Sequence, residues 1–312
     1  MSIKNFKGYL LAAIAAAAYG TNPAFAVPLY EQGMNPTSVL LFRYLLGLPI
    51  IAMIIKMRNI PFLLKRKEIA PVAILGILMA LSSLTLFESY RFMNSGIAST
   101  LLFVYPILVA VMMIFFFHER FKISVALCLA IMSIGLWMLM KPQNGGGISL
   151  MGVTLVMISA LTYALYIIYT NVSNTIKSIH TSKLLFYVLL WGSLLYIIMI
   201  PLGAELTIPQ KPSGWGSLIA LAILPTVLSL ACTTKAIQLI GSTSTAIFGA
   251  LEPVSAVILS VTFLGQAITL QDIIGGSLIV IATLIIIADK QIDHALQRIL
   301  KLFPALNKHN QQ

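Results

Sequence analysis

The carboxyl group of Glu252 lies within an almost wholly apolar run, IFGALEPVSAVIL at residues 247–259, and directly precedes Pro253. A buried carboxyl is costly to ionise, because an apolar environment disfavours its charged form. Such a group is either held permanently protonated as a structural hydrogen-bond donor, or it exchanges a proton. We expect an exchanging group, and Pro253 would help by leaving the carbonyl of Gly249 free for a second polar contact.

Further polar side chains in apolar stretches could face the same ligand. Arg43 either contacts an anionic group or binds helix-end carbonyls or Glu88. In the sequence YGTNP, Pro23 removes a hydrogen bond to the carbonyl of Tyr19, and Asn22 either faces a cavity or bonds that carbonyl. The side chains expected near a cavity are Tyr19, Asn22, Arg43, Tyr105, Tyr163, Tyr166 and Glu252. The expected helix breaks are Pro23, Pro106 and Pro253.

The residues of common catalytic and metal sites are missing from the apolar stretches. The four His stand in loops or in the C-terminal tail, and HERFK has Lys122 where a zinc protease would have its second His. No GxxxxGK[ST] motif is present to bind ATP, and the Gly triplet of KPQNGGGIS, residues 141–149, is typical of a linker. Cys128 and Cys232 are expected to be buried thiols. We therefore expect no enzyme, no metal site and no cofactor.

The composition is that of a membrane protein. The chain has 312 residues, of which 59% are hydrophobic and 9% charged, whereas a soluble domain has roughly 25% charged residues. A membrane-spanning helix needs roughly 20 apolar residues. Stretches of this kind lie near 8–30, 37–56, 69–90, 96–117, 122–140, 149–171, 181–202, 214–238, 244–264 and 270–288. The expected fold is an all-α integral membrane protein with ten transmembrane helices.

The net charge of +11 is explained by the side of the membrane on which the cations lie. If the N-terminus is cytoplasmic, only Arg91, Lys141 and Lys211 of the 20 Lys and Arg fall outside, and Arg43 lies within a span. Cytoplasmic loops are enriched in Lys and Arg, so both termini are expected on the cytoplasmic side of a bacterial inner (plasma) membrane. No nucleic-acid partner is needed. The basic tail, residues 289–312, is expected on the anionic inner leaflet.

The two halves of the chain resemble each other. At a shift of 144 residues, GYLLAAIAAAAYG (8–20) matches GVTLVMISALTYA (152–164), which aligns Tyr19 with Tyr163. At a shift of 147, GIASTLLFVYP (96–106) matches TSTAIFGALEP (243–253), so that Tyr105 corresponds to Glu252. The halves are residues 6–141 and 149–288. Because each unit contains an odd number of spans, five, the second must be inserted upside down relative to the first.

Several of these segments carry a family resemblance: YGTNPAFA closing the first span, Arg43 in the second, AST…FVYP…HERF (98–121) and STSTAIFGALEP…LGQAI (242–268). The chain resembles an EamA-type member of the drug/metabolite transporter superfamily over roughly residues 6–288. The resemblance implies that the first four spans of each half enclose a central cavity. It also implies that the fifth and tenth spans lie outside that cavity, in a monomer or a homodimer. One departure is that Gln266 stands where the first half has Glu119.

Inverted repeats are typical of secondary transporters, whose sites lie near the middle of the membrane. We expect a transporter that exports small metabolites, such as amino acids or related amphipathic compounds, by alternating access. Its partners would be the small-molecule substrate, the lipid bilayer and protons, which Glu252 would exchange. The alternatives are an exchanger or importer of anionic metabolites, a hydrophobic-cation multidrug exporter with Glu252 as counter-ion, and a channel or lipid scramblase.

Overall fold

The computed structural model of the protein describes residues 3–93, 95–119, 122–139, 149–201, 205–255, 258, 269–271 and 273–286. All regular secondary structure in these residues is helical. The helices are α1 (Ile3–Tyr19), α2 (Asn22–Glu31), α3 (Pro36–Met57), α4 (Arg66–Ser89), α5 (Ser95–Leu102), α6 (Tyr105–Phe117), α7 (Ile123–Leu139), α8 (Leu150–Val172), α9 (Asn174–Lys177), α10 (Thr181–Met199), α11 (Pro212–Leu221), η1 (Ala222–Leu228), α12 (Ser229–Ile240) and α13 (Ser242–Gly249). Residues 251–255 and Ile273–Ile286 are also helical.

Six helical segments are long and apolar enough to cross a membrane: Lys4–Glu31, Pro36–Met57, Arg66–Ser89, Leu150–Val172, Thr181–Met199 and Pro212–Ile240. They coincide with six of the predicted spans. Three shorter apolar helices, Tyr105–Phe117, Ile123–Met138 and Ile273–Ile286, fall in three others. The predicted span 244–264 begins with α13 and extends beyond the described residues.

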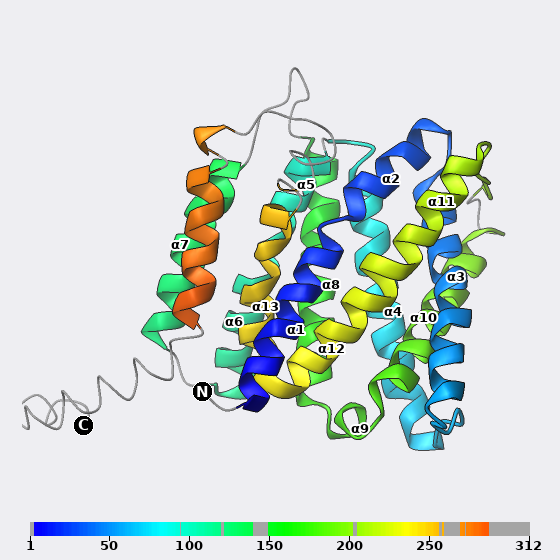
Figure 1. The fold of residues 1–312 in the computed structure, drawn as a ribbon, viewed down its shortest axis with the longest axis horizontal. Helices are drawn as coiled ribbons and strands as arrows, with labels where there is room; N and C mark the ends of the chain where they lie inside the picture. The colour runs from blue at the N-terminus through cyan, green and yellow to red at the C-terminus, as the bar shows by residue number, and fades with distance from the viewer. Residues whose placement is uncertain are drawn as a thin grey trace, which may run out of the picture.

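The long helices form a bundle in which segments distant in sequence lie side by side (Figure 1). α1 packs along α12, α4 packs along α8, and α10 packs against both α3 and α4. Between α3 and α10, the rings of Tyr44 and Tyr196 meet at 5.3 Å, and both are fully buried. A Cβ atom on Gly192 would lie 2.5 Å from the Tyr44 ring, so the small residue allows this close helix approach.

α7 and the helix Ile273–Ile286 stand together at one side of the bundle (Figure 1). A Cβ atom on Gly135 of α7 would lie 2.8 Å from the carbonyl oxygen of Gly275, and the thiol of Cys128 donates to the carbonyl of Ala282 at 3.2 Å. Gly275 thus packs against α7 of the same chain.

Three apolar segments are interrupted just before a proline. α1 gives way to α2 at Gly20 and Thr21, α5 to α6 at residues 103–104, and α13 to residues 251–255 at Ala250. Pro23 and Pro106 occupy the first turns of α2 and α6, where the missing N–H costs nothing. Pro23 and Pro106 therefore begin helices rather than bend the interior of one.

Candidate functional site

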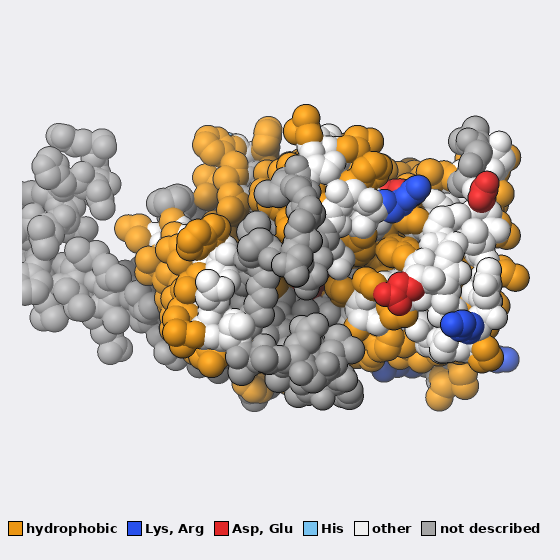
Figure 2. Space-filling view, turned by 90° about the horizontal axis from the view of Figure 1, so that it is seen from above, with side chains coloured by type: hydrophobic (Ala, Val, Ile, Leu, Met, Phe, Trp, Pro, Cys, Tyr) orange, Lys and Arg blue, Asp and Glu red, His pale blue; other side chains and the backbone are white. Residues whose placement is uncertain are grey.

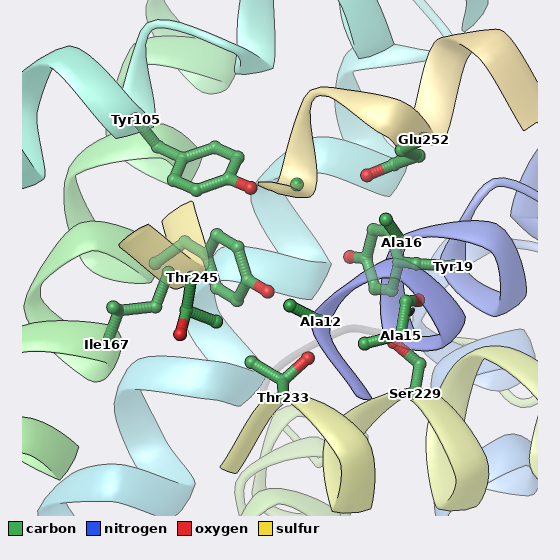
Figure 3. A pocket seen from close by; sticks show the side chains of 12 residues that line it. Ala12, Ala15, Ala16, Tyr19, Tyr105, Ile167, Ser229, Thr233, Thr245 and Glu252 are labelled. Carbon is green, nitrogen blue, oxygen red and sulfur yellow. Dashed lines mark hydrogen bonds between the residues drawn. The ribbon is translucent and has the colours of Figure 1, made fainter. Parts of the chain in front are cut away.

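A small cavity lies between α1, α6, α8, α12 and α13 (Figure 3). Its lining is formed by Ala12, Ala15, Ala16, Tyr19, Tyr105, Tyr163, Ile167, Ser229, Thr233, Thr245, Gly249 and Glu252. The cavity volume is about 20 Å³, which accommodates roughly one water molecule. A larger ligand therefore requires movement of the surrounding helices.

Glu252 brings the only charged side chain to the described lining of the cavity. Its side chain points into the cavity in Figure 3, and the residue is 8% exposed. Within the described part of the chain, the carboxyl forms neither a hydrogen bond nor an ion pair. A Cβ atom on Gly20 would lie 2.6 Å from the backbone oxygen of Glu252, so the break between α1 and α2 can approach this residue only because Gly20 lacks a side chain.

Three tyrosine rings form an aromatic wall of the cavity. The rings of Tyr19 and Tyr163 are nearly parallel, with centroids 6.4 Å apart and 13° between their planes. Tyr105 meets Tyr163 edge to face at 4.8 Å. Its hydroxyl donates to the carbonyl of Ala246 at 3.3 Å and lies directly over Gly249, where a side chain would collide with it. Tyr19 and Tyr163 occupy equivalent positions in the two halves of the sequence, and the structure brings them together.

The rest of the lining consists mainly of alanines and small hydroxyl residues that the sequence analysis did not identify. Ser229 donates to the carbonyl of Ala15 at 2.9 Å, and Thr245 donates to the carbonyl of Gly241 at 2.7 Å. Thr233 follows Ser229 by four residues on α12, a spacing that places both on one helix face. That spacing was the available signal, but hydroxyl residues are common enough in membrane helices that it did not stand out.

Arg43 lies outside this cavity lining, in a cluster of its own. Its Nε donates to Thr226 Oγ1 at 2.6 Å, and its Nη1 donates to Asn22 Oδ1 at 3.0 Å. The guanidinium group also lies 5.6 Å from the centroid of the Phe87 ring, within reach of a cation–π interaction. The residue is fully buried. The alternative in which Arg43 binds Glu88 is wrong, because Glu88 instead pairs with Arg91 at 3.2 Å.

The other two predicted residues have structural partners. Asn22 accepts from Arg43 through its Oδ1, and its Nδ2 donates to no group in the described residues, so it does not bond the carbonyl of Tyr19 that Pro23 leaves free. The hydroxyl of Thr21 donates to the preceding carbonyl, that of Ala18, at 2.7 Å. Tyr166 stacks behind Tyr163 at 6.1 Å, and its hydroxyl lies 3.4 Å from Thr234 Oγ1. Of the predicted side chains, Tyr19, Tyr105, Tyr163 and Glu252 thus line the cavity, whereas Asn22, Arg43 and Tyr166 do not.

Comparison with known proteins identifies the fold and the class. A crystal structure of another protein matches with a TM-score of 0.76 and 17% sequence identity, over 89% of this chain and 95% of that one. At this identity the match shows a common fold alone.

Two relatives have names that state a general activity. The uncharacterized inner membrane transporter YicL of Salmonella typhimurium is 26% identical over 294 residues, covering 91% of this chain and 96% of YicL. The uncharacterized transporter YdfC of Bacillus subtilis is 24% identical over 249 residues, covering 78% of this chain and 79% of YdfC.

The model of the EamA-like transporter family matches residues 6–141 and again residues 150–288, which together make up most of the chain. With the apolar helices, this match identifies an integral membrane transporter rather than an enzyme. The chain belongs to the EamA-like transporter family.

Proposed function

We propose that the chain is a secondary transporter of ten spans, arranged as two inverted five-helix units, 6–141 and 149–288. Repeated hydrogen bonds support this arrangement. The sequence shifts of 144 and 147 relate Ala15 to Ser159 and Ser82 to Ser229. The hydroxyl of Ser82 donates to the carbonyl of Ser159 at 3.1 Å, and that of Ser229 donates to the carbonyl of Ala15 at 2.9 Å. In one contact the hydroxyl comes from the first unit and the carbonyl from the second, and in the other contact these roles are reversed. A two-fold relation between the units requires this reversal.

The helix packing supports the same relation. The pair α1 and α12 corresponds to the pair α8 and α4, and both pairs are in extensive contact. α3 and α10, which correspond to each other, pack together. In Figure 1, α1 begins at the end of the bundle where α8 finishes, so these equivalent helices run in opposite directions. Opposed equivalent helices are expected of an alternating-access carrier.

Both termini are proposed to lie on the cytoplasmic side of the bacterial inner membrane. Figure 2 looks onto the end of the bundle where α2 finishes and α11 begins, and few Lys and Arg side chains are visible there. Cysteine labelling from outside should reach positions within 31–36, 143–148 and 205–213 but not within 59–68. The opposite pattern would reject the topology. Residues 143–148 and the basic tail, 289–312, lie outside the described residues.

The proposed cargo is a small amphipathic metabolite with an amino group, and the proposed direction is export. The observation that carries this proposal is the carboxyl of Glu252, which has no partner among the described residues and faces a cavity walled by tyrosines. A carboxylate favours a cationic group on the ligand, and the aromatic rings favour an apolar or cationic body. The cavity lies where α1 and α13 end, so the adjoining breaks give its walls places to bend.

Glu252 would couple the cargo to protons. When the cavity opens to the cytoplasm, the carboxyl would lose its proton and pair with the amino group of the cargo. When it opens outward, a proton would displace the cargo. A carboxyl cannot hold a proton and an ion pair at once, so the two ligands would exclude each other, which is the minimum requirement for an antiporter.

Contacts between α6 and α13 are consistent with closure of the cytoplasmic side. Beyond the end of α6, the carboxylate of Glu119 accepts a hydrogen bond from Thr243 of α13 at 2.8 Å. Nearer the cavity, Tyr105 of α6 donates to Ala246 of α13. Opening toward the cytoplasm would separate these helices and break both hydrogen bonds. Since Gln266 replaces the equivalent acidic residue in the second half, this contact would act on one side only.

Of the alternatives, a hydrophobic-cation exporter is supported by the same carboxyl group. A carrier of anionic metabolites would need a cation in the cavity, and Arg43 does not line it. Metabolite profiling tests the proposal: cells that overexpress the wild-type chain should deplete an amine-containing metabolite, and cells that express Glu252→Gln to the same level should not. Identical profiles of these cells and of cells without the gene would reject it.

A further inference from the structure

The charges around the cavity distinguish an amine from an amino acid. Glu252 is the sole charged residue in the described lining. The other described titratable groups around it are the phenols of Tyr19 on α1, Tyr105 on α6, Tyr163 on α8 and Tyr90 beyond the end of α4, together with Arg43 of α3, which lies outside the lining and interacts electrostatically with Tyr19 and Tyr90. Phenols are neutral at physiological pH, since their ordinary pKa is about 10. When Glu252 is ionised, the described lining therefore carries one negative charge and no positive charge.

From this we infer that the site binds monocationic amines and discriminates against zwitterions, an inference that rests on the proposed transport function. An ammonium group would pair with Glu252, while the rings of Tyr19, Tyr105 and Tyr163 would face its cationic or apolar body. The hydroxyls of Tyr19 and Tyr163 have no hydrogen-bond partner in the described structure, so they remain available to the ligand. The ligand class is an aryl or alkyl amine without a carboxylate.

The carboxylate of an amino acid would lack a counter-ion in this site. In the described structure, the buried cation on the neighbouring elements is Arg43, which is not a lining residue; its Nε and Nη1 donate to Thr226 and Asn22, and its Nη2 has no partner in the described residues. A cargo carboxylate would instead share a small, water-poor site with Glu252. Two carboxylates at close range repel each other and cannot both stay ionised, and a buried charge without a partner is strongly disfavoured.

The hydroxyl groups cannot replace a cation. Ser229 and Thr245 already donate to the backbone carbonyls of Ala15 and Gly241. Tyr19, Tyr163 and Thr233 could donate to an anion, but neutral donors do not cancel its repulsion by Glu252. They suit the hydroxyl or N–H groups of an amine equally well. The polar lining thus accommodates a monocation better than a zwitterion.

The experiment compares four ligands that share one ring: 2-phenylethylamine, phenylalanine, 3-phenylpropionate and 2-phenylethanol. Their binding to the purified full chain in detergent is measured by calorimetry at pH 8. The amine should bind at least about tenfold more tightly than phenylalanine or 3-phenylpropionate. Lowering the pH to 5 should weaken the binding of the amine and leave that of the neutral alcohol unchanged, because protons would compete for Glu252.

Two variants test which carboxylate is responsible. Glu252→Gln should reduce the affinity for the amine by at least about tenfold. The matched control, Glu88→Gln, removes a carboxylate that pairs with Arg91 and lies outside the cavity lining, and it should bind the amine as the wild type does. Thermal unfolding of both variants without ligand verifies that they are folded, and the pH titration of the wild type needs no variant.

Equal or tighter binding of phenylalanine at pH 8 would overturn the selectivity, and so would amine binding that is independent of pH. If metabolite profiling still shows export in either case, the transport proposal stands and only the selectivity fails. If profiling shows no exported metabolite, the transport proposal fails, whatever the binding assay shows.

Discussion

Arg43 and Glu252 are both buried charged residues of the membrane bundle, but their surroundings differ. Arg43 is fully buried, donates to Thr226 and Asn22, and lies against the rings of Tyr44 and Phe87, and only its Nη2 has no hydrogen-bond partner in the described residues. Glu252 is nearly as buried, yet its carboxyl has no partner in the described structure and faces a cavity. Proteins rarely leave a buried charge uncompensated, because its desolvation is not repaid. The difference suggests that Arg43 holds helices together, whereas Glu252 is left available for a proton or a cargo.

The largest expected effect comes from Glu252→Gln, which keeps the shape of the side chain and removes its charge. Loss of the counter-ion and of the exchangeable proton should lower gradient-driven export in reconstituted liposomes by about 100-fold, since removing one partner of a buried charge pair costs about 2–5 kcal/mol. Stability should change little, because no described protein group bonds the carboxyl. Transport by Glu252→Gln at the wild-type rate, with Glu252→Ala merely less stable, would make Glu252 a packing element like Arg43.

The second effect concerns stability rather than transport. Arg43→Leu should lower the free energy of unfolding by about 2–5 kcal/mol, because it leaves Oδ1 of Asn22 buried without its donor and removes the hydrogen bond to Thr226, which keeps only its bond to the carbonyl of Leu221. Unfolding in detergent measures this loss. A variant that unfolds like the wild type but no longer transports would place Arg43 at the cargo and remove the contrast with Glu252.

These two residues also indicate how far the sequence could predict the site. The depth of Glu252 followed from its place in an apolar run, because a charge there is rare on any fold. The separation of Arg43 from Glu252 could not be predicted, since it depends on which helices meet across the bundle. Thr226, the partner of Arg43, lies in η1, a π-helical segment containing Pro225. A single proline does not specify such a segment.

The fold, like the site, was predictable only in part. The apolar lengths and the repeat identified an all-helical membrane bundle, and the prolines marked three real breaks. The pattern did not show that each break lies before its proline, because this depends on cap geometry such as the hydrogen bond from Thr21 to Ala18. Nor could it identify Thr233 or Thr245 as lining residues, since helix rotation decides which hydroxyls face a cavity.

A third, intermediate effect tests whether the break in the first span positions Glu252. Gly20→Ala would place a Cβ atom 2.6 Å from the backbone oxygen of Glu252, and relieving this collision should cost about 1–3 kcal/mol of stability. Transport should also fall, because the two broken segments would move apart. Gly216→Ala is the matched control, since nothing lies within 4 Å of its Cβ position. If both variants behave alike, the close approach of Gly20 to Glu252 is unimportant.

The smallest effect separates structure from function within a pair of equivalent hydrogen bonds. Ser82→Ala and Ser229→Ala each remove a buried hydroxyl that donates across the two halves, to Ser159 and Ala15 respectively. Each loss should lower stability by about 0.5–1.5 kcal/mol, the usual net value of a hydrogen bond. Ser229 also lines the cavity next to α1, and Ser82 does not. Export measured under the same proton gradient should therefore fall a few-fold in Ser229→Ala and remain at the wild-type rate in Ser82→Ala. Equal losses of transport would mean that the contact between the halves, rather than the cavity lining, limits the rate. The distinction between a structural residue, Arg43, and a ligand-binding residue, Glu252, would then not extend to Ser82 and Ser229.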